Sequence, residues 1–281
     1  MNNIISVITP SYNQGEFISD TIKSVLSQKG EFYIDYIILD AGSTDNSVSV
    51  IKNYESLLKN DSDTVMSGGL TYHVNRDPDA SLNRCLGISY RWASEKDRGQ
   101  SHAINKGLAA SKGDIITWLN SDDGYTSDDV YDMIFQEFLK HENRFVFYGG
   151  AIAVDGNNKE LWRHLPGQVT LYSLLYREGV AQPSIFFSRD VVKSVGFLNE
   201  ELHYFMDYDY WFRFLFAGYR FYRIDQFIAV QKYHGKSKSN EGGKMFESFY
   251  PEASKWKNHY KKKLLHDNPV RYLFYRLKSI F

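Results

Sequence analysis

The chain has 281 residues, of which 43% are hydrophobic, and it carries 33 basic and 34 acidic side chains. Its composition excludes a disordered chain, and its balanced charge gives no sign of a nucleic-acid-binding protein. A single cysteine, Cys85, excludes internal disulfides and a cysteine-rich metal cluster and fits a reducing compartment. We see no signal sequence and no apolar run of roughly 20 residues, so we expect a cytoplasmic protein.

The first half of the chain alternates between strands and helices. Apolar runs of strand type occupy residues 4–9, 36–39, 88–93 and 115–119. Apolar residues at helical spacing lie between them, in residues 17–26, 47–58 and 101–111. This alternation predicts an α/β fold with a mostly parallel sheet that helices cover on both faces.

The second half of the chain is less regular. Helices are predicted for residues 128–140, 189–195 and 208–216, the last two ended by Gly196 and Gly218. Strands are predicted for residues 145–148, 151–154, 184–187 and 227–230, with a hairpin turn at residues 155–158.

Polar residues follow three of the predicted strands. They occupy residues 10–13, 40–45 and 120–123. Parallel strands aim their carboxyl ends at one edge of a sheet, so we expect these tips to converge on one crevice. The adjacent carboxylates Asp122 and Asp123 suit a divalent cation shared with phosphates, and Asp40 suits a base N–H group. Each tip taken alone is also an ordinary turn or helix cap.

Three further segments have both a chemical and a plain structural interpretation. Residues 94–107, rich in charged and amide groups, predict either an anion site at a helix start or an exposed, capped helix. Asp207 and Asp209 begin a helix among aromatic residues, where an acid is either stabilised by the helix dipole or desolvated toward a general base. His234, after the strand at residues 227–230, is either a ligand or a satisfied structural residue.

In this order the motifs resemble those of a family 2 glycosyltransferase with the GT-A fold. The similarity covers residues 4–239 and rests on residues 7–13, 40–45, 94–107, 113–123 and 206–211. It implies that Asp40 reads the nucleotide base, Asp97 lines the nucleotide-sugar pocket, Asp122 binds a divalent metal and Asp207 is the catalytic base. With it we expect a donor site that also includes Pro10, Tyr12, Asn13, Gln100, Asn105, Asn120 and Ser121.

One position departs from the family pattern. The Asp-x-Asp motif of the family reads Asn120-Ser121-Asp122 here, so a neutral amide replaces the first carboxylate. We expect weaker binding of Mn²⁺ or Mg²⁺, with Asp123 and His234 completing the metal site.

The resemblance implies an inverting transfer of a sugar, UDP-linked, to a hydroxyl of a saccharide or lipid-linked saccharide, in bacterial-type surface polysaccharide or glycolipid assembly. We expect residues 1–240 to form one catalytic domain, with the nucleotide-sugar half at residues 1–125 and the acceptor half at residues 126–240. The alternatives are a nucleotide-sugar-binding protein without turnover and a nucleotidyltransferase. The second would need a basic loop near the N-terminus, and residues 10–16 contain no Lys or Arg.

Residues 241–281 are expected to form a helical tail. From Lys255 to Phe281 there are eight Lys or Arg against the single acid Asp267, interleaved with aromatic residues and broken at Asn268-Pro269. This pattern favours an anionic membrane surface on the inner face of the membrane, and the alternative is a helix packed on the catalytic body.

The connection from Asn60 to Gly87 is longer than usual for such a fold. We expect either a part in acceptor recognition, with Tyr72 and His73 stacking on a sugar ring, or a plain surface excursion.

Overall fold

The computed structural model describes residues 3–77, 81–141, 145–177, 179–235, 237 and 249–279. Parts of the long connection (residues 78–80), of the segment after His234 (residues 236 and 238–240) and of the tail (residues 241–248, 280 and 281) therefore lie outside the described residues. The elements are, in chain order, β1 (Ile4–Ser11), α1 (Ile18–Leu26), β2 (Lys29–Asp40), α2 (Ser47–Asn60), β3 (Ser62–Ser67), β4 (Leu70–Asn75), β5 (Arg84–Ser94), α3 (Gln100–Ala110), β6 (Ile115–Trp118), β7 (Gly124–Tyr125), α4 (Val130–Lys140), β8 (Phe145–Asp155), β9 (Glu160–His164), α5 (Leu171–Tyr176), the 3₁₀ turn η1 (Gln182–Ser184), β10 (Ile185–Ser188), α6 (Arg189–Val195), α7 (Met206–Phe216), β11 (Arg220–Tyr233), α8 (Tyr250–Asp267) and α9 (Pro269–Lys278).

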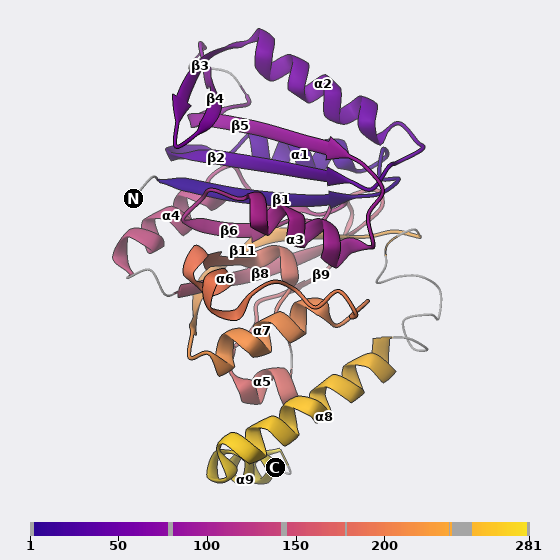
Figure 1. Ribbon diagram of the computed structural model, residues 1–281, viewed down its shortest axis with the longest axis vertical. Coiled ribbons are helices and arrows are strands. Elements are labelled where there is room, and N and C mark those ends of the chain that lie inside the picture. Colours follow the sequence, from indigo (N-terminus) through magenta and orange to yellow (C-terminus); the bar gives the residue numbers. More distant parts are fainter. Residues whose placement is uncertain are drawn as a thin grey trace.

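One large sheet runs through both halves of the chain (Figure 1). Its strands follow the order β3-β4-β5-β2-β1-β6-β10-β8-β11-β7, with β9 added beside β8. The neighbours β5, β2, β1 and β6 are parallel, and β8 is parallel to β11. Because β10 is antiparallel to both β6 and β8, β11 runs in the same direction as β1. The predicted α/β fold with a mainly parallel sheet is confirmed, and the carboxyl ends of β1, β2, β5, β6 and β11 share one edge.

Helices cover both faces of the sheet, because its strands are apolar on both sides. On β1, Ile5 and Val7 face the cluster that contains α1, α2 and α4, whereas Ile8 faces the cluster that contains α3 and α5–α8. The period of two that separates these side chains is that of an extended strand. The α3 and α7 side faces the viewer in Figure 1, and the α1 and α4 side lies behind it.

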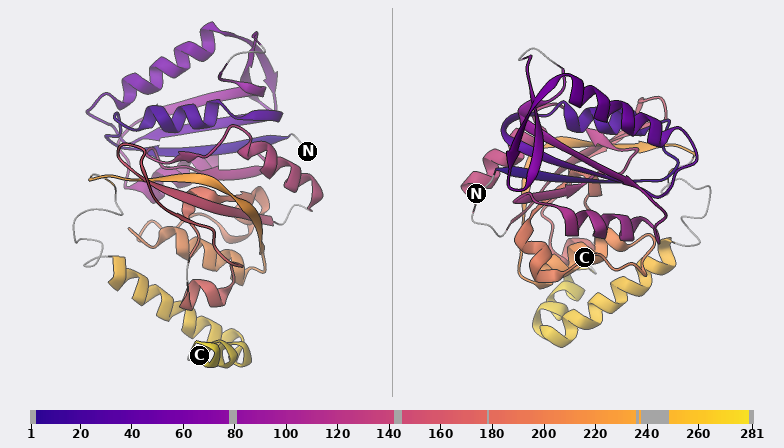
Figure 2. Two further views of the ribbon diagram at one scale, coloured as in Figure 1. Left: turned by 180° about the vertical axis from the view of Figure 1, so that it is seen from behind. Right: turned by 45° about the horizontal axis from the view of Figure 1, so that its top comes forward.

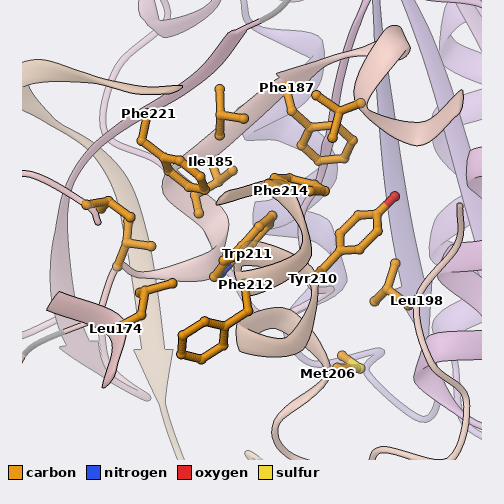
Figure 3. Close-up of a cluster of buried hydrophobic side chains, with 14 of the residues drawn as sticks. Leu174, Ile185, Phe187, Leu198, Met206, Tyr210, Trp211, Phe212, Phe214 and Phe221 are labelled. Carbon is orange, nitrogen blue, oxygen red and sulfur yellow. The ribbon is translucent and has the colours of Figure 1, made fainter. Parts of the chain in front are cut away.

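Helix α7 lies deep in the buried cluster that contains α3 and α5–α8 (Figure 3). Trp211 is fully buried and stacks on Trp118 of β6 with ring centroids 5.2 Å apart. On the same helix, Phe214 packs against Phe187 of β10 at 5.4 Å. Such close aromatic packing fixes α7 against the strand that leads into residues 120–123, and so places the start of α7 relative to the carboxyl edge.

The expected element ends are mostly confirmed. Helix α6 ends at Gly196 and α7 ends just before Gly218, with φ of 76° and 85°, the left-handed conformation that glycine adopts freely. The expected strands 145–148 and 151–154 are one strand, β8, because Gly149 and Gly150 let β11 pack directly against it. A Cβ atom on Gly149 would lie 2.8 Å from Cγ1 of Ile228.

The structure of the connection from Asn60 to Gly87 differs from both expected roles. Strands β3 and β4 form a hairpin with a Gly68-Gly69 turn and extend the sheet. Tyr72 is fully buried against Ile4, and Nδ1 of His73 lies 3.0 Å from the Ser62 hydroxyl. Neither ring is available to a sugar, so the expected stacking role is wrong.

The tail is helical, is broken at Asn268 as its sequence predicted, and packs on the body. Helix α8 packs on the body through Tyr260 and Leu264, which are buried. After the break at Asn268, whose side chain accepts from the backbone N–H of Arg271, α9 turns back on α8. The pair lies at the opposite end of the molecule from the β3–β4 hairpin (Figures 1 and 2).

Candidate active site

A cavity of about 620 Å³ lies at the carboxyl edge of the sheet. It is lined by eight of the expected site residues: Pro10, Tyr12, Asp97, Gln100, Asn120, Ser121, Asp122 and Asp123. Its wall also contains Ser11 and Lys96, from the predicted site segments 10–13 and 94–107, and residues that sequence reasoning missed: Gln14, His203, Gln231, Lys232, Tyr233 and Ser237. Five of the expected residues are not part of the wall: Asn13, Asp40, Asn105, Asp207 and His234.

The tips of β1 and β2 are tied to each other by side chains. Asn13 has a φ of 52°, and its amide oxygen accepts from the backbone N–H of Thr44 at 2.8 Å. Asp45 accepts from the backbone N–H of Gly15 at 2.9 Å. Asn13 therefore joins two loops, and its direct binding of the donor stays a prediction. Its neighbours Tyr12 and Gln14 line the cavity instead.

Asp40 is buried directly behind the cavity wall. Its carboxylate accepts from the backbone N–H groups of Gly42 and Ser43, from the Ser43 hydroxyl at 2.5 Å and from the Ser94 hydroxyl at 2.6 Å. These bonds shape the loop whose Ala41 and Gly42 line the cavity. A role for Asp40 in reading a base stays a prediction, and it requires a base N–H to replace one of the hydroxyl donors.

The segment after β5 contributes a wall at the start of α3. Asp97 accepts from the backbone N–H of Gly99 at 2.8 Å, and Gln100 donates from Nε2 to Oδ1 of Asn120 at 2.8 Å. Lys96 lines the same wall. A lysine beside the first residue of an 11-residue helix suits a phosphate, since backbone N–H groups and a cation both favour negative charge there.

Asn105 is not part of the cavity wall. Its side-chain amide exchanges two hydrogen bonds with the backbone of Leu198, at 3.0 and 2.8 Å, and donates to Oε1 of Glu200 at 3.1 Å. The amide thus holds the segment before α7 against α3, and binding of the donor by Asn105 stays a prediction.

Asp122 and His234 form a pair at the end of β6 and β11. Nε2 of His234 lies 3.1 Å from Oδ2 of Asp122, and the imidazole stacks on Phe17 with ring centroids 3.9 Å apart. The His234 side chain is 6% exposed and that of Asp122 is 16% exposed. The Asp122 carboxylate reaches the cavity, and an aromatic ring holds the imidazole of His234 against it.

Asp123 is held differently from Asp122. One carboxylate oxygen accepts from the backbone N–H of Lys232 at 3.2 Å and the other from Nδ2 of Asn120 at 3.0 Å. Burial and the neighbouring Asp122 raise the pKa of Asp123 well above its usual range. Across the described ranges of the chain, three His, Cys, Asp or Glu side chains do not gather into a metal-binding group. Asp123 thus fixes the loop through two hydrogen bonds, and a role for it as a metal ligand stays a prediction.

Lys232 provides a buried cation next to this loop. Its ammonium lies 3.1 Å from Asp20 and 5.5 Å from the centre of the Phe17 ring, and its side chain is 6% exposed. The sequence carried a usable signal here, because residues 231–234 follow the apolar run at residues 227–230, as residues 120–123 follow the run at residues 115–119.

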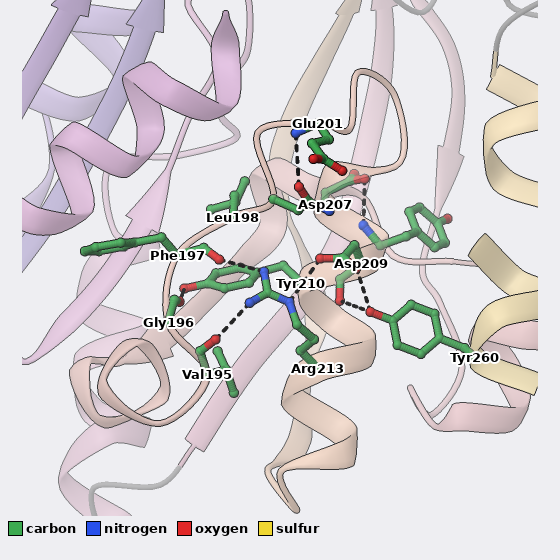
Figure 4. A network of polar contacts seen from close by, with 12 residues as sticks. Val195, Gly196, Phe197, Leu198, Glu201, Asp207, Asp209, Tyr210, Arg213 and Tyr260 are labelled. Atoms are coloured by element: carbon green, nitrogen blue, oxygen red, sulfur yellow. Dashed lines mark hydrogen bonds and ion pairs between the residues drawn. The ribbon is translucent and has the colours of Figure 1, made fainter. Parts of the chain in front are cut away.

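Asp207 lies half-buried in the first turn of α7, outside the cavity wall (Figure 4). Its Oδ1 accepts from the backbone N–H of Tyr208 at 2.7 Å. The preceding Met206 accepts through sulfur from the Ser101 hydroxyl at 2.8 Å, so the start of α7 touches the start of α3. His203, four residues before Asp207, lines the cavity wall.

Asp209, two residues further along α7, is buried and bound to side chains of the protein. Its carboxylate is 4% exposed, pairs with Arg213 at 3.0 Å and accepts from the Tyr260 hydroxyl at 2.6 Å. Burial and the adjacent carboxylate raise the pKa of Tyr260. Arg213 also donates to the backbone oxygens of Val195 and Phe197. This network joins three segments of the fold (Figure 4).

Comparisons with known proteins agree with this arrangement. The chain is 25% identical over 228 residues to a protein named for teichuronic acid biosynthesis, the glycosyltransferase TuaG of Bacillus subtilis, a match that covers 80% of this chain and 77% of that protein. A glycosyltransferase of Rickettsia typhi is 25% identical over 225 residues, 75% of this chain, which spans only 58% of it.

Solved structures share the fold at lower identity. S. aureus TarS 1–349, solved with UDP, has a TM-score of 0.56 at 16% identity and covers 82% of this chain and 61% of its own. The mannosyltransferase PcManGT from Pyrobaculum calidifontis, solved with GDP-Man and Mn²⁺, has a TM-score of 0.52 at 16% identity and covers 81% of this chain and 56% of its own. The sequence model described as glycosyl transferase family 2 matches residues 6–66 and 79–195, so the chain belongs to this glycosyltransferase family.

Proposed function

We propose that this protein is an inverting glycosyltransferase that moves a sugar from a UDP-linked donor to an acceptor hydroxyl with the help of Mn²⁺ or Mg²⁺. The single observation that carries the proposal is the cavity at the carboxyl edge, where Asp97, Asp122 and Lys96 meet. The continuous sheet supports treating residues 1–240 as one catalytic domain. TarS, solved with UDP and with UDP-GlcNAc, supports a uridine donor, and TuaG supports an acceptor in cell-surface polysaccharide assembly.

The donor would lie across the tips of β1, β2, β5 and β6. Tyr12 is 59% exposed and offers a ring face to the uracil base or the ribose. Lys96 and the start of α3 would hold the diphosphate. The Asn120 amide, already fixed by Gln100, would donate or accept at the ribose, in the place where the family pattern has an acid.

The residues at the end of β6 and β11 fit a divalent cation. Asp122 and His234 supply a carboxylate oxygen and an imidazole nitrogen within 3.1 Å of each other, and diphosphate oxygens would complete the coordination. The mixed oxygen and nitrogen set favours Mn²⁺ over Mg²⁺, which prefers oxygen ligands alone. When bound, the cation stabilises the negative charge of the leaving diphosphate.

Asp207 would act as the general base. It accepts the proton of the acceptor hydroxyl while the hydroxyl oxygen forms a bond to the anomeric carbon. The bond between that carbon and the diphosphate oxygen breaks on the opposite face, which inverts the anomeric configuration. The support for this role is the short separation in sequence between Asp207 and His203, which lines the cavity, and the acceptor would enter from this side, beside the donor.

A panel of nucleotide sugars tests the donor assignment. We expect UDP-glucose or UDP-N-acetylglucosamine with Mn²⁺ to raise the melting temperature, and GDP-mannose to have a smaller effect. Binding to the folded state alone stabilises it by RT ln(1 + [L]/Kd), roughly 2.7 kcal/mol at a hundredfold excess over Kd. A larger shift with GDP-mannose would contradict the uridine assignment, and no shift with any member would contradict the donor site.

Association with an anionic membrane is the second part of the proposal, and helix α9 supports it. Val270, Leu273, Phe274 and Leu277 share one face of this helix and are 77%, 54%, 61% and 61% exposed. Basic side chains flank this face at Arg271, Arg276 and Lys278, and α8 adds Lys261, Lys262 and Lys263. Among the described helices, none is long and apolar enough to span a bilayer. An apolar face bordered by cations matches the interface of an anionic leaflet, where each cation contributes ~1 kcal/mol.

Cosedimentation with vesicles tests this part. We expect the full chain to pellet with phosphatidylserine vesicles in low salt, to pellet less with phosphatidylcholine vesicles, and to be released as salt rises. Leu273→Asp combined with Phe274→Asp should abolish pelleting, whereas Leu161→Asp, at a 51% exposed leucine of β9, should not. A full chain that stays in the supernatant with phosphatidylserine vesicles would contradict the membrane assignment.

A further inference from the structure

The start of α7 is capped by a residue from another helix. The N-cap position of α7 is Phe205, whose side chain makes no capping hydrogen bond. Glu252, in the first turn of α8, instead accepts from the three backbone N–H groups that lead into the helix. Its carboxylate accepts from the backbone N–H groups of Phe205 at 2.7 Å, Tyr204 at 3.0 Å and His203 at 3.3 Å.

A second contact fixes the direction of α8 against α7. The Tyr260 hydroxyl donates to Asp209 at 2.6 Å, and its ring stacks on Phe212 with centroids 4.3 Å apart. Glu252 and Tyr260 are eight residues apart, about 12 Å along a helix. Two anchors at this separation hold α8 along the first turns of α7 and prevent rotation of one helix relative to the other.

Residues 203–205, whose N–H groups donate to Glu252, lie next to the proposed active site. His203 lines the main cavity and also a second, smaller cavity of about 210 Å³, which includes Arg98, Gly99, Gln100 and Glu200. Two residues after Phe205 comes Asp207. A shift of the 203–205 backbone would therefore move both the wall shared by the two cavities and the carboxylate proposed as base.

We propose that Glu252 is a positioning residue for glycosyl transfer, through which the C-terminal helix α8 sets the acceptor side of the active site. This inference rests on the proposed function of Asp207. Charge-assisted bonds to N–H groups at a helix start are among the stronger hydrogen bonds in proteins, and an acid there is also favoured by the helix dipole. The tail is thus part of the catalytic geometry as well as a candidate contact with a membrane.

The strand tips proposed to bind the donor are held independently of this contact. The tips of β1, β2, β5 and β6 are held by their own bonds, such as those of Asp40 to Ser94 and of Gln100 to Asn120. Loss of Glu252 should therefore separate donor binding from turnover. A general weakening of the fold would reduce both together.

The test compares Glu252→Ala and Glu252→Gln with Asp267→Asn, a matched removal of an acid at the far end of α8, where Asp267 pairs with Lys263. The assay measures release of UDP from UDP-N-acetylglucosamine or UDP-glucose, whichever the panel selects, with water as the acceptor. We expect Glu252→Ala to lower kcat about 10-fold or more, because small misplacements of catalytic groups are costly, while donor Kd stays within about twofold. Glu252→Gln keeps one oxygen acceptor and should fall between Glu252→Ala and the wild type, and Asp267→Asn should match the wild type.

Amide hydrogen exchange gives a readout that needs no turnover. In Glu252→Ala we expect faster exchange at residues 203–207 and unchanged exchange at residues 115–119 of β6 and the loop after it. Unchanged exchange at 203–207 together with wild-type kcat would overturn the positioning role. A wild-type protein that releases no UDP, but shows the exchange difference, would contradict the proposed function and leave the capping contact established.

Discussion

Asp207→Asn should lower turnover by ~10²-fold or more while it leaves donor affinity unchanged. The amide keeps the size of the side chain and can still accept from the N–H of Tyr208, but it cannot take a proton from an acceptor hydroxyl. The measurement is kcat for UDP release, together with calorimetric donor Kd in Mn²⁺. Because Asp207 lies outside the wall of the donor cavity, the two quantities should separate cleanly.

Asp209→Asn is the matched control, since it makes the same change two residues further along α7. The Asp209 carboxylate is buried and pairs with Arg213, whose side chain is 27% exposed, so its substitution removes the charge partner of a half-buried guanidinium. Loss of such a charged hydrogen bond costs about 1–3 kcal/mol of stability, so we expect a lower melting temperature. We expect kcat of the folded enzyme to be preserved, because the amide oxygen can still accept from the Tyr260 hydroxyl. If Asp207→Asn turns over like the wild type, or if Asp209→Asn is the variant that loses kcat, the assignment of the base is wrong.

Asp122→Ala should remove the metal dependence of donor binding. The wild type should bind UDP at least about 10-fold more tightly in Mn²⁺ than in a chelator, since the cation joins the carboxylate to the diphosphate. In the variant, His234 alone remains of the paired ligands, and Kd should be the same in both buffers. Titration calorimetry with UDP decides between these results, and equal binding by the wild type with and without chelator would contradict a metal at Asp122.

Asn120→Asp restores the acid that the family pattern has at this position. An added negative charge next to Asp122 should tighten Mn²⁺ binding, measured by titrating Mn²⁺ into the UDP complex. The substitution also replaces the amide donor that Asn120 offers to Asp123. A weaker Mn²⁺ affinity in this variant would show that the hydrogen bond to Asp123 matters more to the site than the extra charge.

Much of the fold could be predicted because local signals agree with the tertiary structure. The strand tips at residues 10–13, 40–45 and 120–123 end parallel strands, and parallel strands place such tips at one edge. Gly196 and Gly218 end their helices because each adopts a positive φ. These features depend on a few consecutive residues, which a single sequence shows directly.

What could not be predicted depends on partners distant in sequence. Asn105 looks like a site residue in its segment, yet Leu198 takes both of its hydrogen-bonding groups. The cap that Glu252 places on α7 joins residues 47 positions apart. The hairpin of β3 and β4 has a local signal, the two-residue turn Gly68-Gly69. The burial of Tyr72, in contrast, depends on contact with Ile4, which the sequence of the hairpin itself does not show.

The stereochemistry of the released sugar tests the central claim most directly. Proton NMR, recorded as the enzyme hydrolyses an α-linked UDP-sugar in Mn²⁺, distinguishes the first anomer formed before mutarotation mixes the two. Attack by water, activated by Asp207, on the face opposite the diphosphate predicts that the β-anomer appears first. First appearance of the α-anomer, or no release of sugar from any UDP-sugar that binds, would contradict an inverting glycosyltransferase.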